Sequence, residues 1–64
     1  MNLSKPTVRV VYDGGGCFYA FTVGPGELLI GDLVVWNTRK FRVIESVENL
    51  FPQYSNRYRL QEFT

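Results

Sequence analysis

The sequence predicts an all-β fold, a small antiparallel barrel of five strands. Five short runs rich in β-branched and aromatic residues alternate with clusters of Gly, Pro, Asn and Asp, a pattern typical of strands joined by tight turns. These runs are too short to form stable helices. The 64 residues suffice for a single domain over 1–64, in which residues 1–5 are expected to form a disordered leader.

The composition of the chain indicates how its fold is stabilised and in which cellular compartment it is expected. A chain this short buries only about 60% of its unfolded surface, so the 16% of residues that are aromatic are expected to form a dense core. Cys17 is the only cysteine, which excludes an internal disulfide and favours a reducing, cytoplasmic location. The sequence has neither a run of apolar residues long enough to span a membrane nor a signal-peptide core, so no membrane partner is expected.

The apolar run at residues 33–36, Leu-Val-Val-Trp, is predicted to be the central strand, buried on both faces. Gly31 and Asp32 suit a tight turn immediately before it. The polar residues 37–40 suit a turn after it. We therefore expect a hairpin that runs from this strand to about Val47.

A second hairpin is predicted on the N-terminal side. Pro6 suits the start of an edge strand over residues 7–12, and the glycine-rich residues 13–16 form the strongest turn signal in the chain. A strand over residues 17–23 follows. Because a phosphate-binding glycine loop precedes a helix rather than a strand, we interpret the glycines as a hairpin turn only.

Alternation within residues 17–23 predicts which side chains face the core. Phe18 is expected on the opposite face, as an exposed aromatic residue. Cys17 is expected to be an inert small hydrophobe, because the sequence has no His to activate its thiol. The expected core face consists of Tyr19, Phe21 and Val23.

The remaining segments are expected to close the barrel. Residues 27–30 would cap one end, and apolar positions that break the alternation predict a β-bulge near residues 44–46. In the irregular connection that follows, Leu50 and Phe51 are expected to pack on the body of the protein. Residues 57–63 alternate and would form the closing strand at an edge, with two side chains directed inward, Tyr58 and Leu60.

Five short strands with frequent turns are typical of a small SH3-like barrel. The pattern Tyr19-x-Phe21, an apolar loop, Gly31-Asp32 before the apolar strand, Thr38 and a strand over residues 43–47 resembles a group of small uncharacterised proteins of bacteriophages and prophages. It also resembles, more faintly, the N-terminal DNA-binding domain of the primosomal replication-restart helicase. The resemblance covers about residues 8–47 and implies the fold, but it transfers no functional residue.

Catalysis is not expected. The chain has no His and one Cys, and its six carboxylates are scattered, so no base and nucleophile pair and no cluster of metal ligands can be identified. Glu27 and Asp32 fall in one loop region and are interpreted as solvated turn residues. We therefore expect no catalytic residue, no metal and no cofactor.

Binding to a protein partner is the first functional hypothesis. The C-terminal third mixes Tyr, Arg and Phe, the residue types enriched at interface hot spots. The phage resemblance implies an accessory protein that binds and modulates a host or defence protein. The candidate contact residues are Phe18, Tyr54, Arg57, Tyr58, Arg59 and Phe63.

Two alternatives remain open. The net charge is only +1, but five basic residues face three acidic ones after Trp36, and they are interleaved with aromatic residues as in single-strand binding grooves. The candidate nucleic-acid contacts are Arg39, Lys40, Phe41, Arg42, Arg57 and Arg59. Alternatively, the C-terminal strand, as an edge strand, could pair with its twin in a homodimer, which would serve as a structural part.

Overall fold

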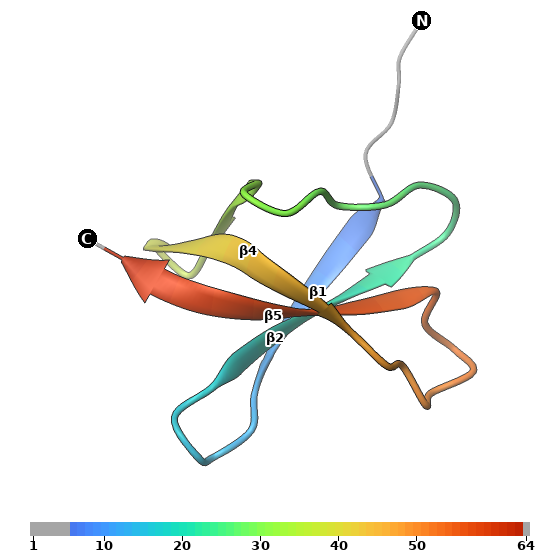
Figure 1. Cartoon of the computed structure of the whole chain (residues 1–64), viewed down its shortest axis with the longest axis horizontal. Coiled ribbons are helices and arrows are strands. Elements are labelled where there is room, and N and C mark those ends of the chain that lie inside the picture. The colour runs from blue at the N-terminus through green and yellow to red at the C-terminus, as the bar shows by residue number, and fades with distance from the viewer. Residues whose placement is uncertain (1–5, 64) are drawn as a thin grey trace, which may run out of the picture.

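Five strands form one antiparallel sheet in the computed structural model, which describes residues 6–63. The sheet curls into a half-barrel, as expected for a small SH3-like fold, and the described residues contain no helix (Figure 1). The predicted all-β class is therefore confirmed, whereas the expected leader at residues 1–5 lies outside the described residues. The strands are β1 (Thr7–Tyr12), β2 (Phe18–Val23), β3 (Leu33–Trp36), β4 (Arg39–Val47) and β5 (Asn56–Phe63).

The order of the strands in the sheet, β1-β2-β5-β4-β3, differs from the expectation at two points. First, β5 lies between β2 and β4, so the C-terminal strand is central and not an edge. Second, β3 pairs only with β4 and is itself an edge strand. The long connection between β4 and β5 lets the chain insert β5 in the middle of the sheet, which leaves β1 and β3 at the two edges (Figure 1).

The prediction that β3 is buried on both faces is wrong. Val34 is buried, but Leu33 and Val35 are 54% and 61% exposed. An edge strand of a single curled sheet has one face on the core, and no second layer formed by the described residues covers its outer face. The apolar run therefore predicted the strand correctly, but it did not predict that one face of the strand is exposed.

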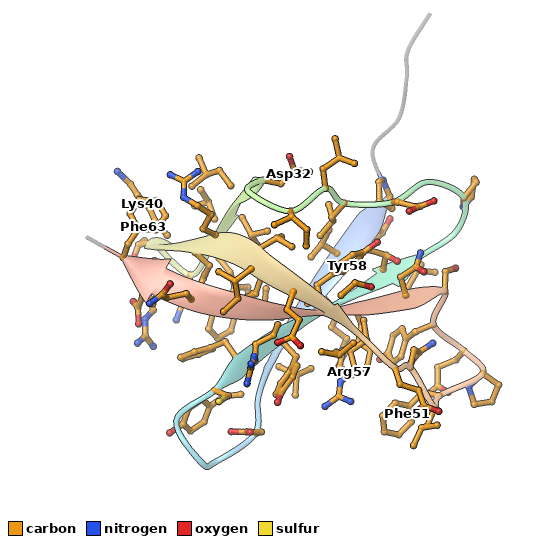
Figure 2. The ribbon with its side chains drawn as sticks, in the orientation of Figure 1. Asp32, Lys40, Phe51, Arg57, Tyr58 and Phe63 are labelled. Atoms are coloured by element: carbon orange, nitrogen blue, oxygen red, sulfur yellow. The ribbon has the colours of Figure 1, made fainter. Side chains whose placement is uncertain are left out.

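The core lies on the inner, concave face of the sheet. Tyr58 and Leu60 point inward from β5, as predicted, and Phe41 and Val43 point inward from β4. Figure 2 shows Tyr58 near the middle of the molecule. Leu28 is buried against this cluster, which confirms that the 27–30 loop caps the core, although Leu29 and Ile30 from the same loop are exposed.

The two faces of β2 are the reverse of the prediction. Ala20 and Thr22 are fully buried on the inner face, and Phe18 packs on the core from the same side. Small side chains are needed there, because Ala20 lies opposite the large Tyr58 ring. Alternation alone is equally consistent with either face and could not decide between them.

The connection between β4 and β5 covers part of the outer face. The rings of Phe51 and Tyr54 lie 5.6 and 4.7 Å from the ring of Phe21, so Phe21 is buried although it points away from the core. The packing of Phe51 on the body is thus confirmed. The same expectation for Leu50 is wrong, since that side chain is 73% exposed.

The predicted β-bulge near residues 44–46, in the hairpin that follows Leu33, is confirmed. The register between β4 and β5 shifts between Val43 and Glu45, which makes Ile44 the extra residue of a β-bulge and bends β4 around the core. The turn between β3 and β4 is shorter than the predicted residues 37–40, because Arg39 and Lys40 already belong to β4. It contains only Asn37 and Thr38, with φ values of 54° and 62°. Two positive φ values are the mark of a type I′ hairpin turn.

Candidate partner-binding site

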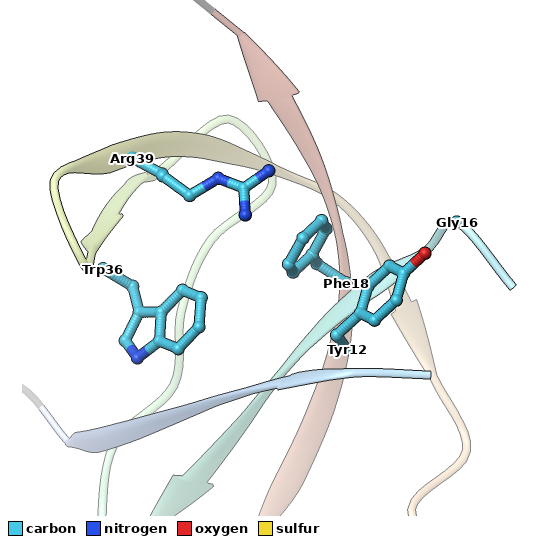
Figure 3. Close-up of a pocket in the computed structure, with 5 residues that line it drawn as sticks. All are labelled: Tyr12, Gly16, Phe18, Trp36 and Arg39. Carbon is cyan, nitrogen blue, oxygen red and sulfur yellow. The ribbon is translucent and has the colours of Figure 1, made fainter. Parts of the chain in front are cut away.

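A cavity of about 430 Å³ opens between the ends of the two hairpins, and we call it the aromatic pocket. Its lining comes from paired residues at the tip of each hairpin. Tyr12 ends β1 opposite Phe18, the first residue of β2, and Trp36 ends β3 opposite Arg39, the first residue of β4. The curl of the sheet brings these two pairs together, with Gly16 from the first turn at the rim (Figure 3).

Phe18 is the centre of the aromatic pocket. Its ring centroid lies 4.8 Å from that of Tyr12 and 6.4 Å from that of Trp36, with the ring planes tilted by 45° and 54°. Below it, Phe41 lies 4.8 Å away in the core. Tilted rings at these distances attract one another and form rigid apolar walls.

Arg39 is fixed at the mouth of the pocket by Glu62. Its Nε and one terminal nitrogen donate hydrogen bonds to the two carboxylate oxygens, both at 2.7 Å, and its guanidinium lies 5.0 Å from the centroid of Phe18. The hydrogen bonds raise the pKa of Arg39 and lower the pKa of Glu62. Both groups are therefore charged at neutral pH, and the planar cation is held in one orientation.

The lining of the aromatic pocket is mainly apolar and aromatic. None of its lining residues carries a carboxylate or a thiol. Within residues 6–63 no group of three or more His, Cys, Asp or Glu side chains is placed to hold a metal ion. What the cavity offers is apolar aromatic surface, with one oriented guanidinium at its edge.

The opposite side of the sheet, which we call the basic outer face, carries most of the positive charge. The register of the strands directs five basic side chains to this face, and Glu45 is the one acidic residue of the strands that shares it. Figure 2 shows Lys40 beside Phe63 at one end and Arg57 toward the end that holds Phe51. The basic residues are Arg9, Lys40, Arg42, Arg57 and Arg59.

Three of these cations are held by contacts within the protein. The guanidinium of Arg57 lies 4.2 Å from the centroid of Tyr19, and that of Arg42 lies 4.9 Å from the centroid of Phe63. Arg59 donates to Glu45 at 2.6 Å, and this hydrogen bond raises its pKa. One face of each of these two rings is thus occupied by a guanidinium group.

The residues proposed to contact a protein partner are divided between the two sides of the sheet. Arg57, Arg59 and Phe63 lie on the basic outer face, and Tyr54 packs on Phe21 at its end. Phe18 is in the aromatic pocket instead of standing exposed. The prediction for Tyr58 is corrected, because this side chain is only 3% exposed and belongs to the core.

The residues proposed to contact nucleic acid are also divided. Four of the six, Lys40, Arg42, Arg57 and Arg59, share the basic outer face. Arg39 faces the other way, toward the aromatic pocket. The prediction that Phe41 contacts nucleic acid is wrong, since its side chain is fully buried.

Sequence reasoning missed Tyr12 and Trp36 as site residues. The signal that could have identified them is their position as the last residue of a strand, directly before a turn. Two hairpins whose tips carry aromatic residues form a pocket only if the sheet brings the tips together, and the sequence does not show that long-range relationship.

Comparisons with protein-family models, with curated proteins and with solved structures found no match to this chain. No helix within residues 6–63 is long and apolar enough to cross a membrane.

Proposed function

We propose that the protein is a non-enzymatic binding module whose aromatic pocket receives an apolar or aromatic side chain of a protein partner. The observation that carries this proposal is the concave cavity between Tyr12, Phe18 and Trp36, with Arg39 at its mouth. Tyr, Trp and Arg are the residue types that dominate interface hot spots, and such hot spots lie in well-packed pockets. The volume falls within the usual range of ligand-binding clefts.

In this proposal, Arg39 orients the side chain that the partner inserts into the pocket. Two of its nitrogens are occupied by Glu62, and the remaining N–H groups of the guanidinium are free to donate to a carbonyl of the partner's backbone. A fixed donor beside an apolar cavity selects one orientation of the inserted side chain. The resemblance to small phage proteins makes a host or defence protein, modulated by this contact, the class of partner that we propose.

Affinity capture from a lysate of the host cells tests the proposal. The wild-type protein should retain a discrete partner, and Trp36→Ala should lose it because the substitution removes one wall of the cavity. Leu50→Ala is the matched control, because Leu50 is an exposed apolar residue that does not line the pocket. Recovery of the same proteins by wild type and Trp36→Ala would contradict a role for the pocket.

A second pair of variants separates the pocket from the other side of the sheet. Tyr54→Ala and Arg57→Ala alter the region of the basic outer face and leave the pocket lining intact. We expect both variants to keep the partner. Loss of the partner with these variants, together with its retention by Trp36→Ala, would move the contact to the outer face.

Binding of single-stranded nucleic acid is the second candidate function, and the basic outer face is the observation that favours it. Five cations on one face, against one acidic residue of the strands, form a positive surface that the small net charge of the chain conceals. Arg9 and Lys40 are exposed and have no side-chain hydrogen bond to any other residue of the described part. They are therefore the cations freest to contact phosphates.

Salt dependence decides this second candidate. If phosphates are bound, the logarithm of the affinity for a single-stranded oligonucleotide should fall linearly with the logarithm of salt concentration, by about 0.7 per contact. Lys40→Gln and Arg9→Gln should each reduce this slope by about one contact. Trp36→Ala is the matched control and should leave the slope unchanged. An absence of oligonucleotide binding at low salt would contradict a nucleic-acid-binding function.

A further inference from the structure

Within residues 6–63, the edge strand β3 leaves part of its backbone without a partner. Trp36 and Arg39 flank a two-residue turn, so they form a hydrogen-bonded pair of the antiparallel ladder. The N–H of Val43 donates to the C=O of Asp32 at 2.9 Å, which continues the same alternation to the start of the strand. By this alternation, Leu33 and Val35 direct their N–H and C=O groups away from β4.

The same two residues also expose apolar side chains. Leu33 and Val35 are more than half exposed on the outer face, and Leu29 and Ile30, just before the strand, are 67% and 62% exposed. Unpaired backbone groups and exposed apolar side chains thus occur at one edge. An edge of this kind is a template for a further strand.

The edge lacks the features that usually prevent such pairing. Its sequence, Leu-Val-Val-Trp, contains no charged residue and no proline. The other edge strand, β1, is protected by comparison, since it carries Arg9 and directly follows Pro6. Charged side chains and proline are the common means by which proteins keep edge strands from associating, so β3 is the edge open to a partner.

We propose that a second copy of this chain pairs with β3, in an antiparallel β3–β3 contact with Val34 on the two-fold axis. In this register Leu33 of one copy lies opposite Val35 of the other. Because both residues direct their backbone groups to the free edge, each of the two Leu33–Val35 pairs exchanges two hydrogen bonds. The two copies of Val34 then form the pair without hydrogen bonds between them, as the antiparallel pattern requires.

The side chains and charges also suit this register. On the outer face, Leu33 of each copy packs beside Val35 of the other, which buries four exposed apolar side chains. Lys40 and Arg42 lie next to β3 on the same face, but the two sets are separated by three strand spacings, about 14 Å. This exceeds the Debye length of about 8 Å at physiological salt, so their repulsion is screened.

The strand contact is short, so the dimer should be reversible. Four residues a side and their neighbours bury less than the roughly 1,200 Å² of a stable interface. The monomer and dimer should therefore exchange with protein concentration. The proposal is independent of the proposed function, because the aromatic pocket lies on the inner face.

Sedimentation velocity over a concentration series tests the dimer. The wild-type mass should rise from 7.4 kDa toward twice that value. Val35→Lys should raise the dissociation constant at least about tenfold, because it places a charge on the edge. Leu50→Lys is the matched control and should assemble like the wild type. A wild type that remains monomeric at its solubility limit, or a Val35→Lys variant that dimerises equally well, would overturn the proposal.

Two further measurements test the backbone pairing itself. Val35→Pro removes an N–H that the ladder with β4 does not use, so the folded spectrum should survive while the dimer is lost. In the wild type, amide hydrogen exchange at Leu33 and Val35 should slow as the concentration rises. This second readout does not depend on the folding of a variant, and exchange at both amides that is independent of concentration would contradict the β3–β3 pairing.

Discussion

The phenolic oxygen of Tyr58 accepts a hydrogen bond from the backbone N–H of Leu28 at 3.1 Å. One partner lies in the central strand β5 and the other in the loop that leads to the edge strand β3. The bond is buried and connects parts of the chain that are distant in sequence. It therefore holds the loop over the end of the core and helps to fix the hairpin that carries Trp36 and Arg39.

The first prediction concerns this bond. Tyr58→Phe keeps the ring but removes the acceptor, which leaves the N–H of Leu28 buried without a partner. The free energy of unfolding should fall by about 1–3 kcal/mol, the usual cost of an unsatisfied buried group. Denaturant unfolding measures the change. Tyr54→Phe, on the outer side, is the control and should change stability by less than about 0.5 kcal/mol.

A second prediction concerns Thr22. Its side chain is fully buried on the inner face, and its hydroxyl has no hydrogen-bond partner within residues 6–63. Thr22→Val has nearly the same shape and removes the unsatisfied group, so it should stabilise the fold by about 1–3 kcal/mol. Thr7→Val, at an exposed position of β1, should have little effect. A less stable Thr22→Val protein would mean that the hydroxyl is satisfied.

The third prediction concerns the turn between β3 and β4. Thr38 has a φ of 62°, a conformation that a β-branched residue adopts only with strain. Thr38→Gly should relieve that strain and raise the free energy of unfolding by about 1 kcal/mol, as measured by thermal or denaturant unfolding. Asn37→Gly should give a smaller change, because Asn tolerates positive φ. Destabilisation by Thr38→Gly would argue against a type I′ turn.

A fourth prediction follows from the ion pair at the mouth of the pocket. The hydrogen bonds from Arg39 lower the pKa of Glu62 below its usual value of 4.5. The stabilisation is therefore fully present above this value and is lost as the pH falls through the lowered pKa. Wild type should melt at a higher temperature than Glu62→Gln at neutral pH.

The difference between these two proteins should shrink when the pH is lowered below 4.5. Because both side chains are partly exposed, added salt should also reduce it. Melting temperatures of the two proteins at neutral pH and at about pH 3, each with and without added salt, supply the test. A difference that persists unchanged in acid would show that the ion pair is not its source.

Local sequence signals predicted the turns and the β-bulge, whose conformations depend on neighbouring residues. The glycine-rich turn after Tyr12, the polar turn after Trp36 and the bulge at Ile44 all depend on residues close to one another in the chain. The glycine-rich turn and the bulge are found where the sequence indicated, whereas the polar turn is shorter than the predicted residues 37–40, because β4 begins at Arg39. Turn residues and broken alternation restrict the backbone directly, whatever the rest of the molecule does.

The features that the sequence did not predict depend on the order of the strands. Residues 48–55 connect β4 to a strand in the middle of the sheet, which leaves β3 at an edge with Leu33 and Val35 exposed. The prediction of which face of β2 points inward was wrong for a related reason. Ala20 lies opposite the large Tyr58 on the neighbouring strand β5, and the small side chain is needed there. Period-two alternation is the same on both faces and cannot contain this information.

The aromatic pocket could not be predicted from the sequence for the same reason. Tyr12 and Phe18 come from one hairpin, whereas Trp36 and Arg39 come from the other. Local patterns predict each hairpin, but the cavity exists only because the curled sheet brings the two tips together. The pocket is therefore a consequence of the fold as a whole.

The most direct test of the account is the dissociation constant of the captured partner, measured with purified wild-type protein and with Trp36→Ala. A wall of a hot-spot pocket contributes at least about 2 kcal/mol, so the constant should rise about thirtyfold. The folded spectrum of the variant should be retained, because Trp36 is 38% exposed and not part of the buried core. Equal constants for the two proteins would contradict the proposal that the aromatic pocket binds the partner.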